Sequence, residues 1–222
     1  MALKKLDRNT IETGGFHGIV QKRLIVNPQY GPRMGVIKGT WPGVGNLIYL
    51  ADSWFETEIA TGMHPHKFID VLTFVVEGKL DHEGSLEHGK SLHALDFQVQ
   101  KSGKEGFIHN EVNHGEQTTR MLQLWLTPEV EEENSGFRVH KAEKGKITKV
   151  YGVQDKNSTQ IEVGHLTTGQ EFTTPEKTLI YMVSGKVRVA GEIVEEGVLF
   201  EADRLILESI ETSLFVIAYS IK

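Results

Sequence analysis

The sequence predicts an all-β protein made of two similar lobes, each a β-sandwich or β-barrel with few and short helices. Two observations support this fold class. Short apolar runs alternate with turn residues along the chain of 222 residues, which contains 23 glycines and 6 prolines, and this spacing leaves no room for long helices. In addition, residues 72–80 align without a gap on residues 179–187, matching Leu, Val, Gly and Lys. This match indicates a duplicated β-domain.

The first half of the chain is predicted as a series of short strands. Residues 71–76, Val-Leu-Thr-Phe-Val-Val, are rich in β-branched and aromatic side chains and are followed by Glu-Gly, as expected of a buried strand that ends in a turn. Residues 79–89 follow as a hairpin with turns at its glycines. The other strand candidates are 18–20, 24–26, 34–37, 47–51, 95–99, 107–111 and 120–126.

An acidic segment at 129–136 separates the two halves. Its charge and its scarcity of apolar side chains prevent it from packing in a core, so we interpret it as a solvated loop. It divides an N-terminal lobe, residues 1–128, from a C-terminal lobe, residues 129–222. The rhythm of short strands continues beyond it, with candidates at 179–187, 202–208 and 214–217.

The composition argues against several classes of function. The chain has 24 basic and 30 acidic residues, a net charge of -6, which disfavours direct binding to the phosphates of nucleic acid. It has no cysteine, so a bound metal would be held by nitrogen and oxygen. No segment reaches the ~18 apolar residues of a membrane span, and the first residues lack the apolar core of a signal peptide. We therefore expect a soluble, cytoplasmic protein.

Two short segments carry the candidate functional site. Side chains at i and i+2 face the same side of a strand, so His64 and His66 would point one way, as would His109 and Glu111. Pro65 favours an extended His64 and cannot donate to a central ladder, which places this segment at a strand end or sheet edge. An isolated pair of histidines is more often solvated. Two such pairs, each beside an apolar run, indicate three imidazoles and a carboxylate around one divalent metal.

Four ordered blocks extend this pattern. They begin with His-Pro-His and end with Gln-Leu-Trp-Leu-Thr-Pro, and they occupy residues 64–78, 82–86, 106–111 and 123–128. The series resembles the signature of the pirin family, in the cupin superfamily, over residues 47–128. The resemblance implies a bicupin of two jelly-roll β-barrel lobes, whose N-terminal lobe holds the metal through His64, His66, His109 and Glu111.

The chain departs from the family at two places. Where the family carries Arg-Gly-Phe-Glu-Thr after the second histidine, this sequence has Lys67, Phe68 and then Ile-Asp-Val. Lys101 to Glu105 likewise replace a Gly-rich turn. We expect these residues to flank the mouth of the pocket, where they would affect substrate choice and activity.

The second half is not expected to hold a metal. In the internal alignment the positions of the two neighbouring histidines are occupied by Glu171 and Thr173, and no histidine follows His165. We therefore expect one metal per chain.

The ligand set leaves open coordination positions and suits Fe(II), with Mn, Ni, Cu and Zn as alternatives. Quercetinase-like pirins oxidise flavonols, so the resemblance implies a quercetin 2,3-dioxygenase acting on a small aromatic substrate and dioxygen. Glu111 could also be the base that takes the flavonol hydroxyl proton. Two alternatives stay open. One is a non-catalytic redox or ligand sensor acting on a protein partner, as a transcription cofactor would; the other is a cupin that binds or isomerises a sugar-like or keto substrate.

An apolar pocket above an open metal would favour the enzyme, and a pocket closed by Phe68 would favour the sensor. Other polar and aromatic residues near the motifs have simpler interpretations. Asp70 is expected on the same strand face as His66, where it could serve the outer coordination sphere. The simplest assignments of the rest are solvated side chains for His82, His88, His93, Lys67 and Lys104, a surface loop for His114, and the core for Phe74 and Trp125.

Overall fold

The computed structural model describes residues 2–32, 38–130 and 132–222. Within these ranges the chain is built of strands, and its helices are two single turns, η1 (Arg8–Thr10) and η2 (Val153–Asp155). The predicted all-β class is therefore confirmed. Neither of these described helices is long and apolar enough to cross a membrane. The strand predicted at 34–37 lies outside the described residues.

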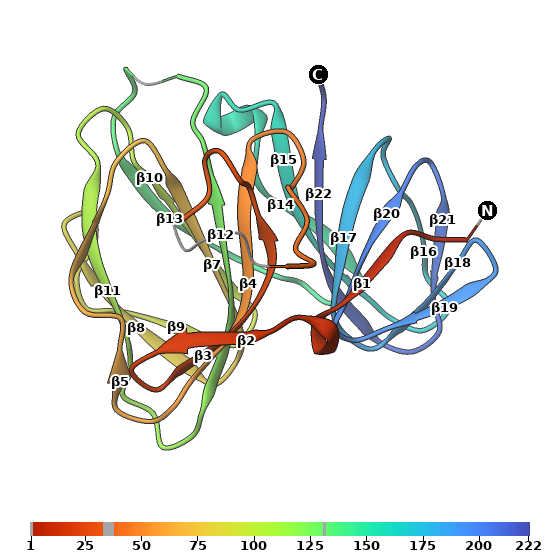
Figure 1. Ribbon diagram of the computed structural model, residues 1–222, viewed down its shortest axis with the longest axis horizontal. Helices are drawn as coiled ribbons and strands as arrows, with labels where there is room; N and C mark the ends of the chain where they lie inside the picture. Colours follow the sequence, from red (N-terminus) through yellow and green to blue (C-terminus); the bar gives the residue numbers. More distant parts are fainter. Residues whose placement is uncertain (1, 33–37, 131) are drawn as a thin grey trace.

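The N-terminal lobe consists of two sheets that enclose a small apolar core of their own (Figure 1). Its strands are β2 (Thr13–Phe16), β3 (Ile19–Val26), β4 (Leu47–Phe55), β5 (Ile59–Ala60), β6 (His64–His66), β7 (Asp70–Glu77), β8 (Lys79–Gly84), β9 (Lys90–His93), β10 (Asp96–Lys101), β11 (Phe107–Asn113), β12 (Thr119–Leu126) and β13 (Gly136–Lys141). The larger sheet has the order β13-β10-β7-β12-β4-β3-β2. The smaller sheet has the order β5-β11-β8-β9, and β6 also pairs with β11.

The C-terminal lobe repeats this arrangement with fewer strands. They are β1 (Lys5–Asp7), β14 (Lys146–Tyr151), β15 (Thr159–Leu166), β16 (Glu171–Thr173), β17 (Thr178–Ser184), β18 (Lys186–Val189), β19 (Glu192–Glu195), β20 (Val198–Ala202), β21 (Ile206–Ser209) and β22 (Ser213–Ser220). The larger sheet runs β1-β20-β17-β22-β15-β14, and the smaller runs β16-β21-β18-β19. Each position in these two orders has a counterpart in the N-terminal lobe. In particular, β7 and β8 correspond to β17 and β18, as the internal alignment predicted.

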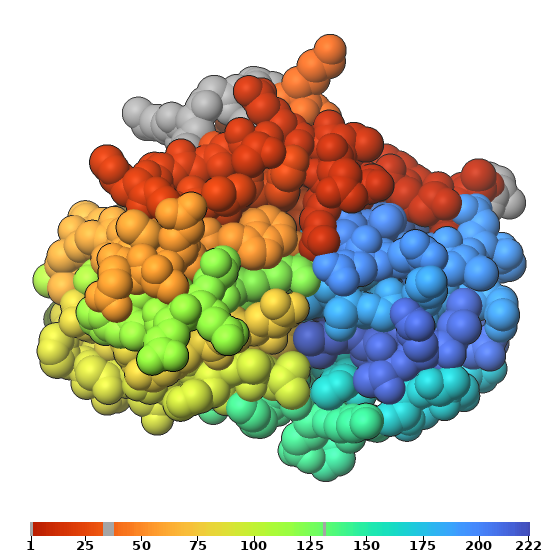
Figure 2. All heavy atoms as spheres, turned by 90° about the horizontal axis from the view of Figure 1, so that it is seen from below, coloured from red at the N-terminus to blue at the C-terminus, as the bar shows by residue number. Residues whose placement is uncertain are grey.

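The two lobes exchange their edge strands. β1 comes from the start of the chain but pairs with β20, whereas β13 follows the acidic segment and pairs with β10. Figure 1 shows β1 beside the strands of the second lobe, and Figure 2 shows the N-terminal segment in red lying across both lobes. The sheets therefore do not follow the expected division of the chain into 1–128 and 129–222, because each lobe completes its larger sheet with a strand from the other part.

The main apolar core lies between the lobes. Leu72, Phe74, Leu122 and Leu124 of the first lobe belong to the same buried cluster as Tyr181 and other side chains of the second. The larger sheets therefore pack on each other through one face and enclose the lobe interiors with the other. Strands buried on both faces need apolar residues at successive positions, which explains why Thr73 alone interrupts the apolar run at 71–76.

Two buried carboxylates join the lobes. Asp52 of β4 accepts hydrogen bonds from Arg120 and, at 2.5 Å, from the hydroxyl of Tyr181. Asp70 of β7 accepts one from Tyr151 of β14 at 2.6 Å and others from Ser102. Asp70 was expected to support the histidines. Its carboxylate instead bonds to Tyr151 and Ser102, which makes it a link between the lobes.

Candidate metal centre

The two predicted histidine segments lie side by side. β6 pairs antiparallel with β11, and His64 lies opposite His109 while His66 lies opposite Phe107. Pro65 between them is exposed, so the two imidazoles point inward together. Gly106 permits this approach, because it has φ of +76° and a side chain there would lie 2.5 Å from the carbonyl oxygen of His66. The sequence therefore predicted both the convergence of the strands and the side that their ligands face.

Three imidazoles converge within metal-binding range. One nitrogen each from His64, His66 and His109 lies within 4.8 Å of the other two. Nε2 of His64 is 3.1 Å from Nε2 of His109, and Nδ1 of His64 donates to the carbonyl of Gly62 at 2.7 Å, which leaves Nε2 free to bind. Two nitrogens that bind one ion at right angles and roughly 2.1 Å lie about 3.0 Å apart. The histidine geometry therefore fits a metal.

Burial keeps two of the three imidazoles neutral, those of His66 and His109. It lowers the pKa of His66 to about 4, with a smaller contribution from His64, and lowers that of His109 to about 2, with smaller contributions from His66 and His64. Nε2 of His66 and Nδ1 of His109 are buried and have no hydrogen-bond partner in the described part of the chain. Metals bind the neutral form of imidazole. At neutral pH His66 and His109 are thus in the protonation state that a metal requires.

Glu111 is fully buried beside this cluster but does not belong to the group of three. Its Oε1 accepts a hydrogen bond from Thr73 at 2.6 Å, and its Oε2 accepts one from Gln123 at 2.9 Å. Burial raises the pKa of Glu111 to about 7, against the opposing effect of these two bonds. A carboxylate has about four acceptor positions, so each oxygen retains capacity for a metal. The role of Glu111 as the fourth ligand remains a prediction.

One histidine assignment was wrong. His82 was expected to be solvated, yet its exposed fraction is 0% and its ring lies 5.7 Å from that of His109. It faces inward because it stands opposite Glu111 in the β8–β11 register, a pairing that the local sequence does not reveal. His88 and His93 are exposed, as predicted, and so is His114, which lies near Glu58.

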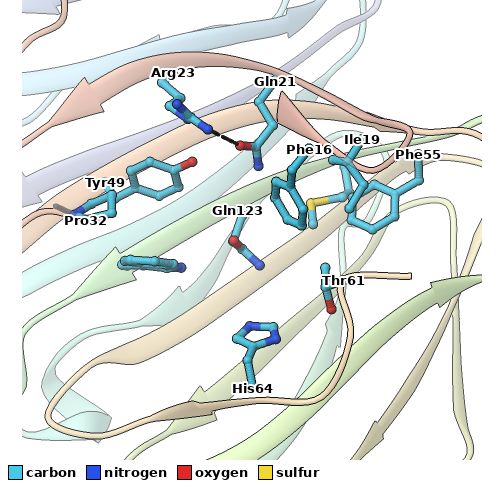
Figure 3. A pocket seen from close by; sticks show the side chains of 12 residues that line it. Phe16, Ile19, Gln21, Arg23, Pro32, Tyr49, Phe55, Thr61, His64 and Gln123 are labelled. Carbon is cyan, nitrogen blue, oxygen red and sulfur yellow. Dashed lines mark hydrogen bonds between the residues drawn. The ribbon is translucent and has the colours of Figure 1, made fainter. Parts of the chain in front are cut away.

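A cavity of about 270 Å³ opens beside His64, in the mouth of the N-terminal lobe (Figure 3). Its walls are largely apolar and aromatic, and Gln21 and Arg23 lie at the end away from His64. The lining residues are Phe16, Ile19, Gln21, Arg23, Pro32, Tyr49, Phe55, Thr61, His64, Met121, Gln123 and Trp125. One imidazole of the cluster, that of His64, thus lines a cavity whose other walls are largely aromatic.

The two aromatic residues that were assigned to the core, Phe74 and Trp125, lie in different surroundings. Phe74 is fully buried in the core, as predicted. Trp125 is partly buried and packs against the small core cluster that contains Tyr49, at a ring distance of 4.8 Å, so its core assignment is met in part. Its ring also lies 5.3 Å from that of His66 and lines the cavity, which the sequence did not predict.

The residues that depart from the family do not line this cavity. Lys67 and Phe68 are exposed and border a separate hollow next to Pro128, and Lys104 and Glu105 border another. Lys101 forms an ion pair with Glu133. The expectation that they flank the mouth of the pocket is therefore not met.

Sequence reasoning missed the polar residues that surround the cluster from the larger sheet. Thr73 and Gln123 hold Glu111, and Gln21 and Arg23 lie at the far end of the cavity. The available signal was the presence of polar residues within apolar strand runs, which is unusual for positions that face a lobe interior.

Comparison with known proteins agrees with this geometry. Residues 46–126, which include all four predicted ligands, match the family described as Pirin. Over its whole length the chain superposes on the crystal structure of the bacterial pirin YhhW from Escherichia coli in complex with nickel(II), with a TM-score of 0.82 and 16% identity, covering 99% of each chain.

Residues 46–126 are thus similar to the pirin family, and the whole chain shares the two-lobed fold of a bacterial pirin.

The sequence similarity to these relatives lies in the part of the chain that carries the histidine cluster. The chain is 32% identical to the quercetin 2,3-dioxygenase of E. coli K12 over 88 residues, which are 39% of this chain and 38% of that protein. It is 37% identical to a pirin-like protein of Caulobacter vibrioides over 79 residues, 34% of each. The aligned part thus spans little more than a third of each relative. Elsewhere the likeness is one of fold.

Proposed function

We propose that the protein is a metal-dependent dioxygenase of the quercetin 2,3-dioxygenase type. His64, His66, His109 and Glu111 would hold one divalent metal, with Fe(II) as the first candidate and Mn, Ni, Cu and Zn as alternatives. The observation that carries the proposal is the convergence of three imidazoles beside an aromatic cavity. Phe68 lies outside this cavity, so the pocket is open to a small molecule, which favours the enzyme over the sensor.

The residues around the site can each be given a task. When bound, the metal would supply Lewis-acid polarisation of a substrate oxygen and redox chemistry with dioxygen. Tyr49 and Trp125 offer aromatic faces against which a flat substrate can pack. Glu111, whose pKa burial raises to about 7 in the metal-free protein, would offer a carboxylate oxygen that can accept a proton. Thr73 and Gln123 fix the orientation of that carboxylate.

The first test combines metal content with oxygen uptake. Purified protein is analysed by plasma mass spectrometry, loaded anaerobically with Fe(II), and assayed for oxygen consumption with quercetin. We expect about one metal per chain and metal-dependent consumption of dioxygen. The matched controls are His109→Ala, which removes a cluster residue, and His88→Ala, which removes an exposed histidine.

Each outcome has a distinct meaning. Absence of metal in every form of the protein would contradict the site itself. About one metal with no uptake would contradict the dioxygenase and favour the sensor acting on a protein partner. For that alternative, the exposed Met63, Phe68 and Ile108 beside β6 and β11 offer an apolar outer face. A cytoplasmic location and the absence of direct nucleic-acid binding stay predictions from the sequence.

A further inference from the structure

The cavity beside His64 carries a positive charge at its far end. Arg23 lies on the same face of β3 as Ile19 and Gln21 and lines the cavity, and only 7% of its surface is exposed. The guanidinium stays charged in proteins. Burying a charge is costly unless an opposite charge or strong hydrogen bonds compensate it. The position of Arg23 therefore needs an explanation.

Arg23 lacks the partner that the other arginines have. The remaining arginines within the described ranges each lie within 4 Å of an Asp or Glu; they are Arg8, Arg120, Arg138, Arg188 and Arg204. No described carboxylate lies that close to Arg23. Its Nη2 and Nε donate to the amide oxygen of Gln21, at 3.0 and 3.3 Å, and its charge opposes the rise that burial causes in the pKa of Tyr49. Neither neighbour neutralises the charge.

The C-terminal lobe has a carboxylate at the position that corresponds to Ala51. Arg23 stands opposite Ala51 in the β3–β4 register, and in the corresponding strands Lys149 stands opposite Glu162. The first lobe thus has a methyl group where the second has a carboxylate. Ala51 in turn stands opposite Gln123, the residue that donates to Glu111.

A glycine on the neighbouring strand allows the guanidinium of Arg23 to lie close against the backbone. Gly14 of β2 packs directly on it, since a side chain at that position would meet Nη1 at 3.0 Å and Cζ at 3.2 Å. The guanidinium is therefore held in place at the end of a slot whose walls include the rings of Tyr49, Trp125 and Phe16.

We propose that Arg23 is an anion-binding residue and that the substrate class is small planar aromatic acids. The metal-binding oxygens of such a compound would face His64, and its carboxylate would bind Arg23. This inference rests on the proposed function, because it divides the same cavity between a metal end and an anion end. A guanidinium matches a carboxylate through two parallel hydrogen bonds. The volume of about 270 Å³ lies just below the range typical of drug-sized ligands and suits one or two rings.

The test uses two compounds that differ only in the carboxylate, 3,4-dihydroxybenzoate and catechol. Their dissociation constants are measured by isothermal titration calorimetry with zinc-loaded protein, because zinc has no redox chemistry with dioxygen. We expect the wild-type protein to bind the acid about tenfold to a hundredfold more tightly. In Arg23→Gln this preference should fall to within about threefold, while affinity for catechol changes little.

Two further variants separate the role of the guanidinium from general effects. Arg23→Lys keeps the charge without the planar fork and should give an intermediate preference. Lys22→Gln removes a positive charge from the opposite face of the same strand, where Lys22 donates to the carbonyl of Ile11, and should keep the wild-type preference. Thermal melts of all variants show whether the fold is retained.

The outcomes separate this inference from the proposed function. Equal affinity of the wild type for both compounds, no binding of either, or a preference retained in Arg23→Gln would overturn the anion subsite. A preference that depends on Arg23 would support it, even if no metal form of the protein consumed dioxygen. In that case the dioxygenase would fail and the binding site for aromatic acids would stand.

Discussion

The two lobes share one framework but fill it with opposite chemistry. In the larger sheet of the first lobe, Thr73 of β7 stands opposite Gln98 of β10 on one side and Gln123 of β12 on the other. These three residues form one row across the strands. In the second lobe the same row is Phe200, Ile180 and Ile217, all within one apolar cluster. The same arrangement of strands therefore accommodates either polar or apolar side chains in the interior of a lobe. What distinguishes the functional lobe is a polar interior that its fold does not require.

The polar interior of the first lobe destabilises the fold at identifiable atoms. Buried side-chain atoms of His66, His82, His109, Gln98 and Gln100 lack hydrogen-bond partners among the described residues, and each such atom is destabilising. In the second lobe the strand that corresponds to β6 reverses its pattern, because Glu171 and Thr173 are exposed and Phe172 packs toward the core. Equivalent strands therefore differ between the lobes. In the first lobe the strand turns histidines into the interior, and in the second it turns a phenylalanine toward the core.

The largest effect is expected from removing a cluster histidine. His109→Ala takes away a fully buried imidazole that faces His64, so metal content should fall from about one per chain to nearly none. The β-fold should remain, because the apolar core between the lobes is untouched. Plasma mass spectrometry and far-UV circular dichroism measure the two properties. Full metal content in this variant, with His88→Ala as control, would refute the assignment of His109 as a ligand.

The polar lobe should also make the metal-free protein sensitive to acid. The pKa values of His66 and His82 in the folded state are about 4 and that of His109 is about 2, so the unfolded chain, with ordinary values near 6.5, binds more protons below pH 6.5. Stability must then fall as pH falls. Glu111, with a folded pKa of about 7, acts in the opposite direction between about pH 4.5 and 7.

The three histidines together outweigh the single carboxylate, so the free energy of unfolding decreases as the pH falls. Each net proton changes the free energy of unfolding by ~1.4 kcal/mol per pH unit. Urea unfolding of metal-free protein at pH 7.0, 6.0 and 5.0 measures the slope, and added zinc should raise the free energy of unfolding at neutral pH because it binds the folded state. A free energy of unfolding that is flat or rises toward pH 5.0 would contradict this picture of the first lobe.

Exchanging residues between the lobes tests the comparison directly. His82 corresponds to Val189 in the internal alignment, and both are fully buried or nearly so. Val189→His should destabilise the protein by about 2–4 kcal/mol, because it inserts a larger polar ring into an apolar core. His82→Leu should stabilise the metal-free protein by about 1–2 kcal/mol, because it removes two unpartnered nitrogens.

Chemical denaturation of the two variants measures both changes, and metal content serves as the second readout. His82→Leu should retain about one metal per chain if His82 is not a ligand. Loss of metal in that variant would move His82 into the ligand set, in the place that we give to Glu111.

The sequence predicted those features that depend on local pattern. The alternation of His64 and His66 around Pro65, and the gapless alignment of 72–80 on 179–187, describe strand faces and repeat spacing directly. The burial of His82 could not be predicted, because it depends on which residue of β11 stands opposite it. The unpaired charge of Arg23 likewise depends on Ala51 across the β3–β4 pair, and the exchange of β1 and β13 depends on packing between lobes. Long-range pairing decided each of these.

The remaining effects concern the two contacts that join the lobes. Tyr151→Phe removes the hydroxyl that donates to Asp70, whose pKa is raised by burial and whose other hydrogen-bond donors among the described residues come from Ser102. Tyr181→Phe removes the hydroxyl that donates to Asp52, which keeps ion pairs with Arg8 and Arg120. We expect losses of about 1–3 kcal/mol for Tyr151→Phe and about 0.5–1.5 kcal/mol for Tyr181→Phe.

The difference between these two variants reports how the lobes are held together. A buried carboxylate without a cation depends more on each remaining donor than one that two guanidinium groups compensate. Parallel urea titrations of both variants give the comparison, with unchanged metal content as evidence that the first lobe is intact. A larger loss in Tyr181→Phe would mean that the arginine cluster around Asp52 depends on the tyrosine for its geometry, and that the lobes are coupled mainly through that cluster.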